Sequence, residues 1–394
     1  MGALVLALQG LLCVVGAHDA CPAVVSRERN DSSERAEVSA GSADEEETDD
    51  GPTRRQLTIG ATTGVGYYSN IFEADGRRAS TVSDGFSQST LKLSIPFMIA
   101  NGTFSATFAA SARAYFSEAQ ADEYLIKPGI EWRAAINQNV TFTAAASVAR
   151  FRELLTFESK RLFDRSEPGW AEAISWTLVA RVSEKSSLNW VTSVEYQTFD
   201  SVPQNNFQST TKAQFTTSMG AGQTFIVGSE WHYYNYPQRP RDSESSVNPV
   251  ALQVVEGRGF VGYNSKLGSG WNLEAEVTCG PNLDITNGYY NAAVLGGMFE
   301  LRYETGRWEL KATLEPEATW FSRRPANLGQ PQRHLLSQQV LLGIGGEFRL
   351  HKNFLLFFSE TFDVLNANGH ASKNDVTANN FRTNVATIGI RITF

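Results

Sequence analysis

Apolar residues recur at every second position in long segments of this chain, and this alternation constrains the fold more than any other feature. In the last segment, Ala386, Ile388, Ile390, Ile392 and Phe394 share one face of an extended chain. A period of two predicts β-strands. Strands of soluble sandwiches average five or six residues, whereas these segments run for about ten to fifteen. The length of the segments therefore favours a membrane barrel over a soluble sandwich.

Sixteen such segments follow one another from residue 56 to the end of the chain. An even number is typical of bacterial single-chain barrels. We expect strands at 56–69, 86–99, 103–117, 123–135, 140–152, 169–182, 188–200, 207–219, 224–236, 249–264, 271–280, 290–304, 308–322, 336–350, 354–366 and 380–394.

The connections between these strands alternate in length. Those after even-numbered strands are brief turns, and most of those after odd-numbered strands are longer and polar. The expected long loops are 70–85, 153–168, 237–248, 281–289, 324–335 and 367–379. This asymmetry predicts an all-β fold, a single transmembrane antiparallel β-barrel with both termini in the periplasm. Because lipid offers no hydrogen-bond partner, such a sheet must close on itself.

Tryptophan placement is consistent with a barrel that crosses a membrane. Aromatic residues gather at both membrane interfaces, and here they fall at both ends of the expected strands. The tryptophans at short-turn ends are Trp132, Trp190, Trp271 and Trp308, and those at long-loop ends are Trp170 and Trp320.

The N-terminal region reads as two segments that precede the barrel of residues 56–394. Residues 1–17 contain an apolar run that ends in small residues, as a secretory signal peptide does, although no Lys or Arg precedes the run. Residues 18–55 are polar and acidic. Such a segment buries too little apolar surface to fold, so we expect a disordered periplasmic tether.

The charge balance excludes a nucleic-acid partner. The chain has 42 acidic residues against 34 Lys and Arg, and residues 1–55 alone hold eleven acids and five arginines. The remainder is therefore nearly neutral and has no basic excess that would suit nucleic acid.

Enzyme and metal signatures are weak. The five histidines are scattered without a His-x-x-x-His pair, so we expect no metal site and no cofactor. The glycine-rich stretches at 64–69 and 343–346 lie in expected strands and lack the lysine of a phosphate loop, so they are interpreted as packing glycines. Glu230 and His232 share the inward face of one strand, which leaves a hydrolase as a minor alternative to a non-enzymatic barrel.

Many charged residues fall on the inward faces, where a water-filled lumen accepts them. Their distribution is uneven, since acids dominate the three strands between 271 and 322 and bases dominate earlier strands. A transverse field across the pore and simple pairing of opposed charges across the lumen are both compatible with this pattern. The bases expected to line the pore are Arg113, Arg133 and Arg181, and the acids are Glu274, Glu276, Glu309 and Glu315.

The expected loop from Glu153 to Pro168 differs from the others because it mixes large apolar residues with dense charge. A loop folded into the barrel can press apolar side chains against the wall and present charge to the pore. We therefore predict that Lys160, Arg161 and Arg165 line a constriction opposite the acids. The alternative is a hairpin that extends above the membrane.

Two short motifs carry a resemblance to known outer-membrane proteins. The alternating C-terminal residues Ile390, Ile392 and Phe394 look like the signal read by the barrel assembly machinery. GVGYYSNIF, Gly64 to Phe72, is similar to the first strand of the β-barrel porin family whose genes lie near exopolysaccharide or exosortase loci, with Tyr68 where that family has Asp.

Together these observations predict a porin-like channel for passive diffusion of small hydrophilic solutes. The expected location is the outer membrane of a Gram-negative-type bacterium, with outer-membrane lipid and the assembly machinery as partners. The alternative suggested by the resemblance is a barrel that serves as a conduit or structural partner in exopolysaccharide export. The sequence leaves the oligomeric state open.

Overall fold

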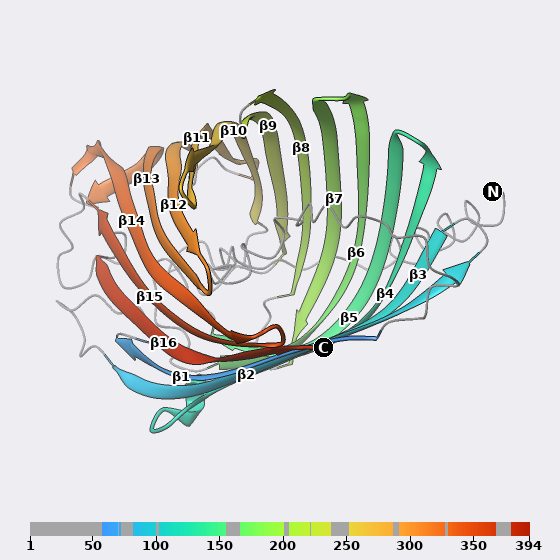
Figure 1. The fold of residues 1–394 in the computed structure, drawn as a ribbon. Helices are drawn as coiled ribbons and strands as arrows, with labels where there is room; N and C mark the ends of the chain where they lie inside the picture. Colours follow the sequence, from blue (N-terminus) through green and yellow to red (C-terminus); the bar gives the residue numbers. More distant parts are fainter. Residues whose placement is uncertain are drawn as a thin grey trace.

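A computed structural model describes residues 57–69, 71, 82–99, 102–154, 166–200, 205–220, 222–237, 252–286, 291–327, 330–367 and 380–394, without the side chains of residues 154, 323–333 and 381. These residues form one closed antiparallel barrel of sixteen strands, with a single-turn 3₁₀ helix η1 at Ala119–Ala121 (Figure 1). The predicted fold class is confirmed. The expected signal peptide 1–17 and tether 18–55 lie outside the described residues.

The strands are β1 Thr58–Ser69, β2 Asp84–Ile99, β3 Gly102–Tyr115, β4 Glu123–Asn137, β5 Val140–Leu154, β6 Ser166–Ser183, β7 Ser186–Phe199, β8 Asn206–Gly220, β9 Gln223–Tyr236, β10 Leu252–Gly268, β11 Trp271–Asp284, β12 Ala292–Thr305, β13 Trp308–Asn327, β14 Gln330–His351, β15 Phe354–Ala367 and β16 Phe381–Thr393. All sixteen expected strands are present. None of the described helices is long and apolar enough to cross a membrane.

Each strand pairs with its neighbours in sequence, and β1 closes the barrel against β16. The closing register runs from Gly60 opposite Thr393 to Ser69 opposite Asn384. Below it, Ile59 and Phe394 exchange two backbone hydrogen bonds of 2.8 and 2.9 Å. Closure leaves no sheet edge, which is the condition for a sheet to cross lipid.

The expected short turns are confirmed where the structure describes them, whereas one expected long loop is wrong. Most of residues 324–335 belong to strands, because β13 continues to Asn327 and β14 begins at Gln330. The register shifts between Trp320 and Pro325 and again before Asn327. A proline cannot donate to the ladder and is tolerated at such an irregularity, so the polar segment expected as a loop is instead a distorted hairpin that includes Pro325.

Other strand ends also differ from the prediction. β11 continues to Asp284, into the expected loop 281–289, and β10 extends to Gly268. The expected loop Glu153–Pro168 loses both ends to strands, because β5 reaches Leu154 and β6 begins at Ser166. The predicted strands were too short because they were ended where polar residues begin. Beyond the apolar band both faces of a strand meet water, so the strand can continue without alternation.

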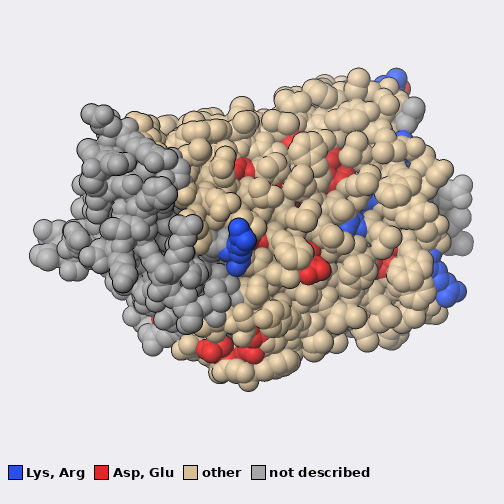
Figure 2. All heavy atoms as spheres, turned by 90° about the vertical axis from the view of Figure 1, so that its left-hand side faces the viewer, with Lys and Arg blue, Asp and Glu red and all other residues tan. Residues whose placement is uncertain are grey.

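The outer face of the wall is apolar. Exposed large apolar side chains occupy every second position, as at Val65, Ile388 and Ile390. Figure 2 shows one side of the barrel, on which a few charged side chains interrupt a surface that is otherwise neither acidic nor basic. Trp271 and Trp308 begin their strands at the short-turn end, and Trp170 and Trp320 lie toward the other end, all four exposed. This arrangement matches the expected aromatic girdles.

Glycines on β1 make room for the best-buried side chains. Phe86 is fully buried and packs with Tyr68, Ile71, Tyr115 and Ala121 inside the long-loop end of the barrel. A methyl group on Gly66 would collide with the Phe86 ring and with the carbonyl oxygen of Ala386. This glycine of the first-strand motif therefore has a packing role.

We predict that Gly66→Ala destabilises the barrel by about 1–3 kcal/mol, because the Phe86 ring must leave its site or the strands must separate. Gly60→Ala is the matched control, since a methyl group there meets nothing within 4 Å. Urea unfolding in detergent measures the difference. Equal midpoints for the two variants would contradict the packing role.

We predict that Phe394→Ala lowers the yield of assembled barrel, because it removes the terminal aromatic of the assembly signal while keeping the backbone bonds to Ile59. Heat-modifiable mobility on a gel reports assembly. Phe358→Ala, which removes another exposed phenyl ring from the outer face, should leave the yield unchanged. A normal yield for Phe394→Ala would argue against the signal.

Candidate functional site: the inner wall of the barrel

Charged side chains line the inner wall because they alternate with the exposed apolar residues of the outer face. On β13, Glu309, Lys311 and Glu315 alternate with the exposed Leu310 and Leu314. The same alternation places most charged residues of the other strands on the inner wall. The predicted inward positions therefore follow directly from the strand register.

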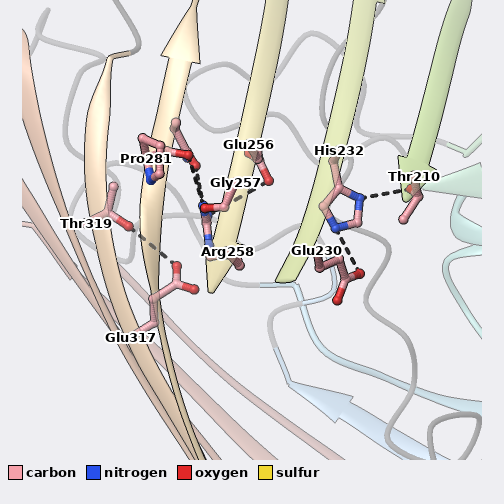
Figure 3. A network of polar contacts seen from close by, with 10 residues as sticks. Thr210, Glu230, His232, Glu256, Gly257, Arg258, Pro281, Glu317 and Thr319 are labelled. Carbon is pink, nitrogen blue, oxygen red and sulfur yellow. Dashed lines mark hydrogen bonds and ion pairs between the residues drawn. The ribbon is translucent and has the colours of Figure 1, made fainter. Parts of the chain in front are cut away.

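Glu230 on β9 is the centre of one inner-wall network. Its carboxylate lies 3.0 Å from Nε2 of His232 and 3.5 Å from Nζ of Lys212. The other ring nitrogen, Nδ1 of His232, lies 3.0 Å from Oγ1 of Thr210 (Figure 3). The Lys212 ammonium also sits 4.9 Å from the centre of the Phe260 ring. Three strands, β8 to β10, are thus joined by side chains as well as by their ladders.

This network contains a carboxylate, an imidazole and a hydroxyl in a row, which is the feature that kept a hydrolase as an alternative. The backbone N–H groups of β8 and β9 around it belong to the sheet ladder, so those groups are not free to stabilise an oxyanion. The Glu230 carboxylate is also shared with Lys212. We therefore interpret the row as a structural hydrogen-bond network.

A second network crosses β12 and β13. Arg302 lies 2.9 Å from Glu300 and 3.5 Å from Glu309, and Lys311 lies 2.7 Å from the second oxygen of Glu300. Arg391 on β16 reaches over β15 to Glu347 on β14 at 2.9 Å. The ion pairs therefore run along the wall between residues of nearby strands.

Amide side chains hold other inner-wall carboxylates. Oε1 of Glu195 accepts hydrogen bonds from Gln197 and Gln208 at 2.6 and 3.0 Å. Gln339 donates to both oxygens of Asp363 at 2.9 Å. An amide satisfies the hydrogen bonds of a carboxylate without itself carrying a charge. The sequence analysis missed these amides, although the alternation of β7, β8 and β14 places them inward.

The residues predicted to line the pore fall into three groups. Arg113 forms an ion pair of 3.2 Å with Glu123 on the adjacent strand, and Glu309 pairs with Arg302. The alternation places Arg133 on β4 and Arg181 on β6 on the inner wall, and both are exposed. It does the same for Glu274 and Glu276 on β11 and Glu315 on β13. The predicted cations Lys160, Arg161 and Arg165 lie outside the described residues.

A polar recess of about 230 Å³ lies at the short-turn end of β12 to β14. Its lining includes Glu304, Arg307, Glu309, Glu347 and Arg349. Among the described residues, no group of three or more His, Cys, Asp or Glu is arranged to hold a metal ion. The recess therefore presents both carboxylates and guanidinium groups at this end of the barrel.

An ion pair between Arg150 and Asp200 lies on the outer face at the long-loop end. Arg150 donates to both oxygens of Asp200, at 3.0 and 2.5 Å, and its guanidinium lies 5.1 Å from the Trp170 ring. These hydrogen bonds from Arg150 hold the pKa of the Asp200 carboxyl below its usual range. Asp200 lies beyond the end of β7, where water replaces the apolar band.

The barrel is similar to several solved structures. It aligns with OccAB3 of Acinetobacter baumannii at a TM-score of 0.52 and 8% identity, over 86% of this chain and 99% of that one. OccAB1 of the same organism aligns at a TM-score of 0.51 and 6% identity, over 86% of this chain and 96% of that one. OpdQ of Pseudomonas aeruginosa aligns at a TM-score of 0.50 and 8% identity, over 87% of this chain and 100% of that one.

At these identities the similarity shows the fold alone, a barrel of the outer-membrane porin type. No protein-family model matches the sequence, and no curated protein matches it. The likeness of Gly64–Phe72 to one porin family therefore stays a resemblance of a single strand.

We predict that Glu230→Ala destabilises the barrel by about 1–2 kcal/mol, because Lys212 and His232 both lose their carboxylate in a partly water-exposed site. Glu131→Ala is the control, since the alternation places it on the inner wall but no ion pair of it is described. The temperature at which the folded gel band disappears measures both. A loss no larger than that of the control would show that the network contributes nothing to stability.

Proposed function

We propose that this protein is a porin-like channel of a bacterial outer membrane, through which small hydrophilic solutes diffuse passively. The observation that carries the proposal is the sixteen-stranded closure around an inner wall of carboxylates, cations and amides. At this strand number a barrel is wider than its own side chains can fill. Polar groups on that wall favour water and polar solutes.

The uneven charge of the wall supports selectivity among solutes. Acids dominate β11 to β13, whereas Arg113, Arg133 and Arg181 lie on β3, β4 and β6. The named ion pairs join nearby strands rather than opposite sides, which favours a transverse field over pairing across the lumen. We extend the proposal to a constriction formed by Lys160, Arg161 and Arg165 opposite Glu274, Glu276, Glu309 and Glu315.

Participation in exopolysaccharide export is the second candidate. It rests on the first-strand motif, and the packing of Phe86 against Gly66 accounts for one of its glycines without any partner. The diffusion channel is therefore the favoured function.

Planar-bilayer recording on the purified full chain tests the proposal. We expect stepwise conductance under an applied voltage. This conductance should scale with salt concentration and should not require a concentration gradient across the bilayer. Liposome swelling with sugars of increasing size then gives the size limit. A correctly folded barrel that passes neither ions nor sugars would reject the diffusion channel and leave the export role.

We predict that the triple variant Lys160→Ala, Arg161→Ala, Arg165→Ala raises the cation preference and changes single-channel conductance, because three positive charges leave the constriction. Reversal potential in a salt gradient measures the preference. The control is Arg152→Ala with Lys352→Ala, since the first faces outward on β5 and the second lies in a turn. If the triple variant keeps both wild-type values, selectivity resides on the barrel wall instead.

A further inference from the structure

Two arginines stand directly opposite each other in the recess at the short-turn end of β12 to β14. Arg307, the last turn residue before β13, accepts a hydrogen bond of 2.8 Å through its carbonyl oxygen from the backbone N–H of Arg349 on β14. This bond continues by one pair the register in which Trp308 lies opposite Phe348. Like charges in opposite positions of two paired strands destabilise a sheet, so two bare guanidinium groups here have a cost.

The described chain brings no anion to this pair. In the part of the chain that the structure describes, no ion pair and no side-chain hydrogen bond joins Arg307 or Arg349 to another residue, and both are exposed. The next residue along their row is Leu355 on β15, and Arg391 on β16 follows it. The Arg391 guanidinium is already held by Glu347 at 2.9 Å. The row therefore presents two cationic groups beside one apolar side chain.

Carboxylates form the neighbouring row of the same recess. Glu304 on β12, Glu309 on β13 and Glu347 on β14 lie opposite one another across three strands. Along β13 and β14 this row is two residues further into the barrel than the arginines, a distance of about 7 Å. Opposite charges thus occupy adjacent rows of a recess of about 230 Å³.

The carboxylate row is short of positive charge. Arg302 on β12 lies 3.5 Å from Glu309 and 4.0 Å from Glu304, but its shortest contact, 2.9 Å, is with Glu300. One guanidinium group is therefore shared among three carboxylates. A further cationic group beside Glu304 and Glu309 would be stabilised by this excess of negative charge.

A solute that carries both charges complements the two rows. A carboxylate accepts paired hydrogen bonds from guanidinium groups, and an ammonium group has three donors for carboxylate oxygens. An amino acid holds both groups on one carbon, and the long side chains of arginine and glutamate can close the distance between the rows. Leu355 adds an apolar contact for a small side chain, as in other solute sites where a few polar groups set the orientation.

We propose that this recess binds small zwitterions of the amino-acid class, with Arg307 and Arg349 on the carboxylate and Glu304 and Glu309 on the ammonium group. The site is open to water, where each ion pair contributes little, so the dissociation constant is on the order of 1 mM. Weak binding suits a channel, because a solute must also leave. The inference names a solute class for the proposed channel and so rests on that function, although the binding itself needs no membrane.

Ligand-observed saturation-transfer NMR on the full chain in detergent tests the site with three probes of similar size. Alanine carries both charges, lactate has a hydroxyl in place of the ammonium group, and alaninamide has a neutral amide in place of the carboxylate. We expect the dissociation constants of lactate and of alaninamide to be at least tenfold above that of alanine. Heat-modifiable mobility first establishes that the sample is folded. A folded barrel that binds none of the probes, or all three equally, would overturn the proposal.

Arg307→Gln combined with Arg349→Gln locates the binding. The dissociation constant of alanine should rise at least tenfold, whereas that of alaninamide should not rise, because this probe has no carboxylate to lose its partner. Lys185→Gln combined with Lys266→Gln is the matched control, since these lysines lie at the same end of the barrel, between β6 and β7 and near the end of β10, and do not line the recess. Equal losses of alanine binding in the two double variants would contradict the site.

Glu304→Gln gives the complementary readout. Removing this carboxylate should narrow the preference for alanine over lactate at least threefold, because the ammonium group loses a partner that lactate never used. Glu131→Gln, a change on the inner wall of β4, should leave the preference unchanged. A preference unaltered in Glu304→Gln, or narrowed as much in Glu131→Gln, would show that the recess does not hold the ammonium group.

Planar-bilayer recording on the same protein separates this inference from the proposed channel. A barrel that conducts ions but binds no alanine rejects the zwitterion site and leaves the channel. A barrel that binds alanine with the expected preferences but does not conduct supports the site and rejects the channel.

Discussion

Backbone hydrogen bonding governs this structure. Every strand must find partners on both sides, because hydrocarbon supplies none and an unpaired N–H or C=O group there costs several kcal/mol. Fifteen ladders between consecutive strands and the β1–β16 closure give every described strand a partner on both sides. Side chains are then free to differ, so that one face of the wall is apolar and the other carries charge.

The inner wall shows how a polar lining is kept stable. Carboxylates are held by cations on nearby strands, as in the pair of Arg391 and Glu347, or by amides, as at Glu195 and Asp363. The first arrangement cancels charge locally and the second preserves it. The distribution of amides therefore shapes the electrostatic field of the lumen as much as the distribution of lysine and arginine does.

The sequence predicted the barrel well because apolar and polar residues alternate where one face of a strand meets lipid and the other meets a polar interior. It failed where that difference ends: β13 and β14 continue past Pro325, although the polar residues there suggested a loop. The alternation along each strand predicted which charged residues face inward. It did not predict their partners, because a pair such as Lys212 and Glu230 depends on the register between two strands. Gln197 and Gln208 were overlooked because the inward residues were selected by charge, and an amide side chain is uncharged.

The closure of the barrel also has a kinetic consequence. The backbone N–H of Asn384 donates to Oγ of Ser69 across 315 residues of chain, and the last residue, Phe394, bonds to Ile59 in the first strand. Contacts so distant in sequence form slowly, since the loop they close is long. Until the final strand arrives, β1 and the growing end are open sheet edges that invite aggregation. A nascent chain of this design needs an escort that shields β1 from the moment it is made until the last strand is delivered.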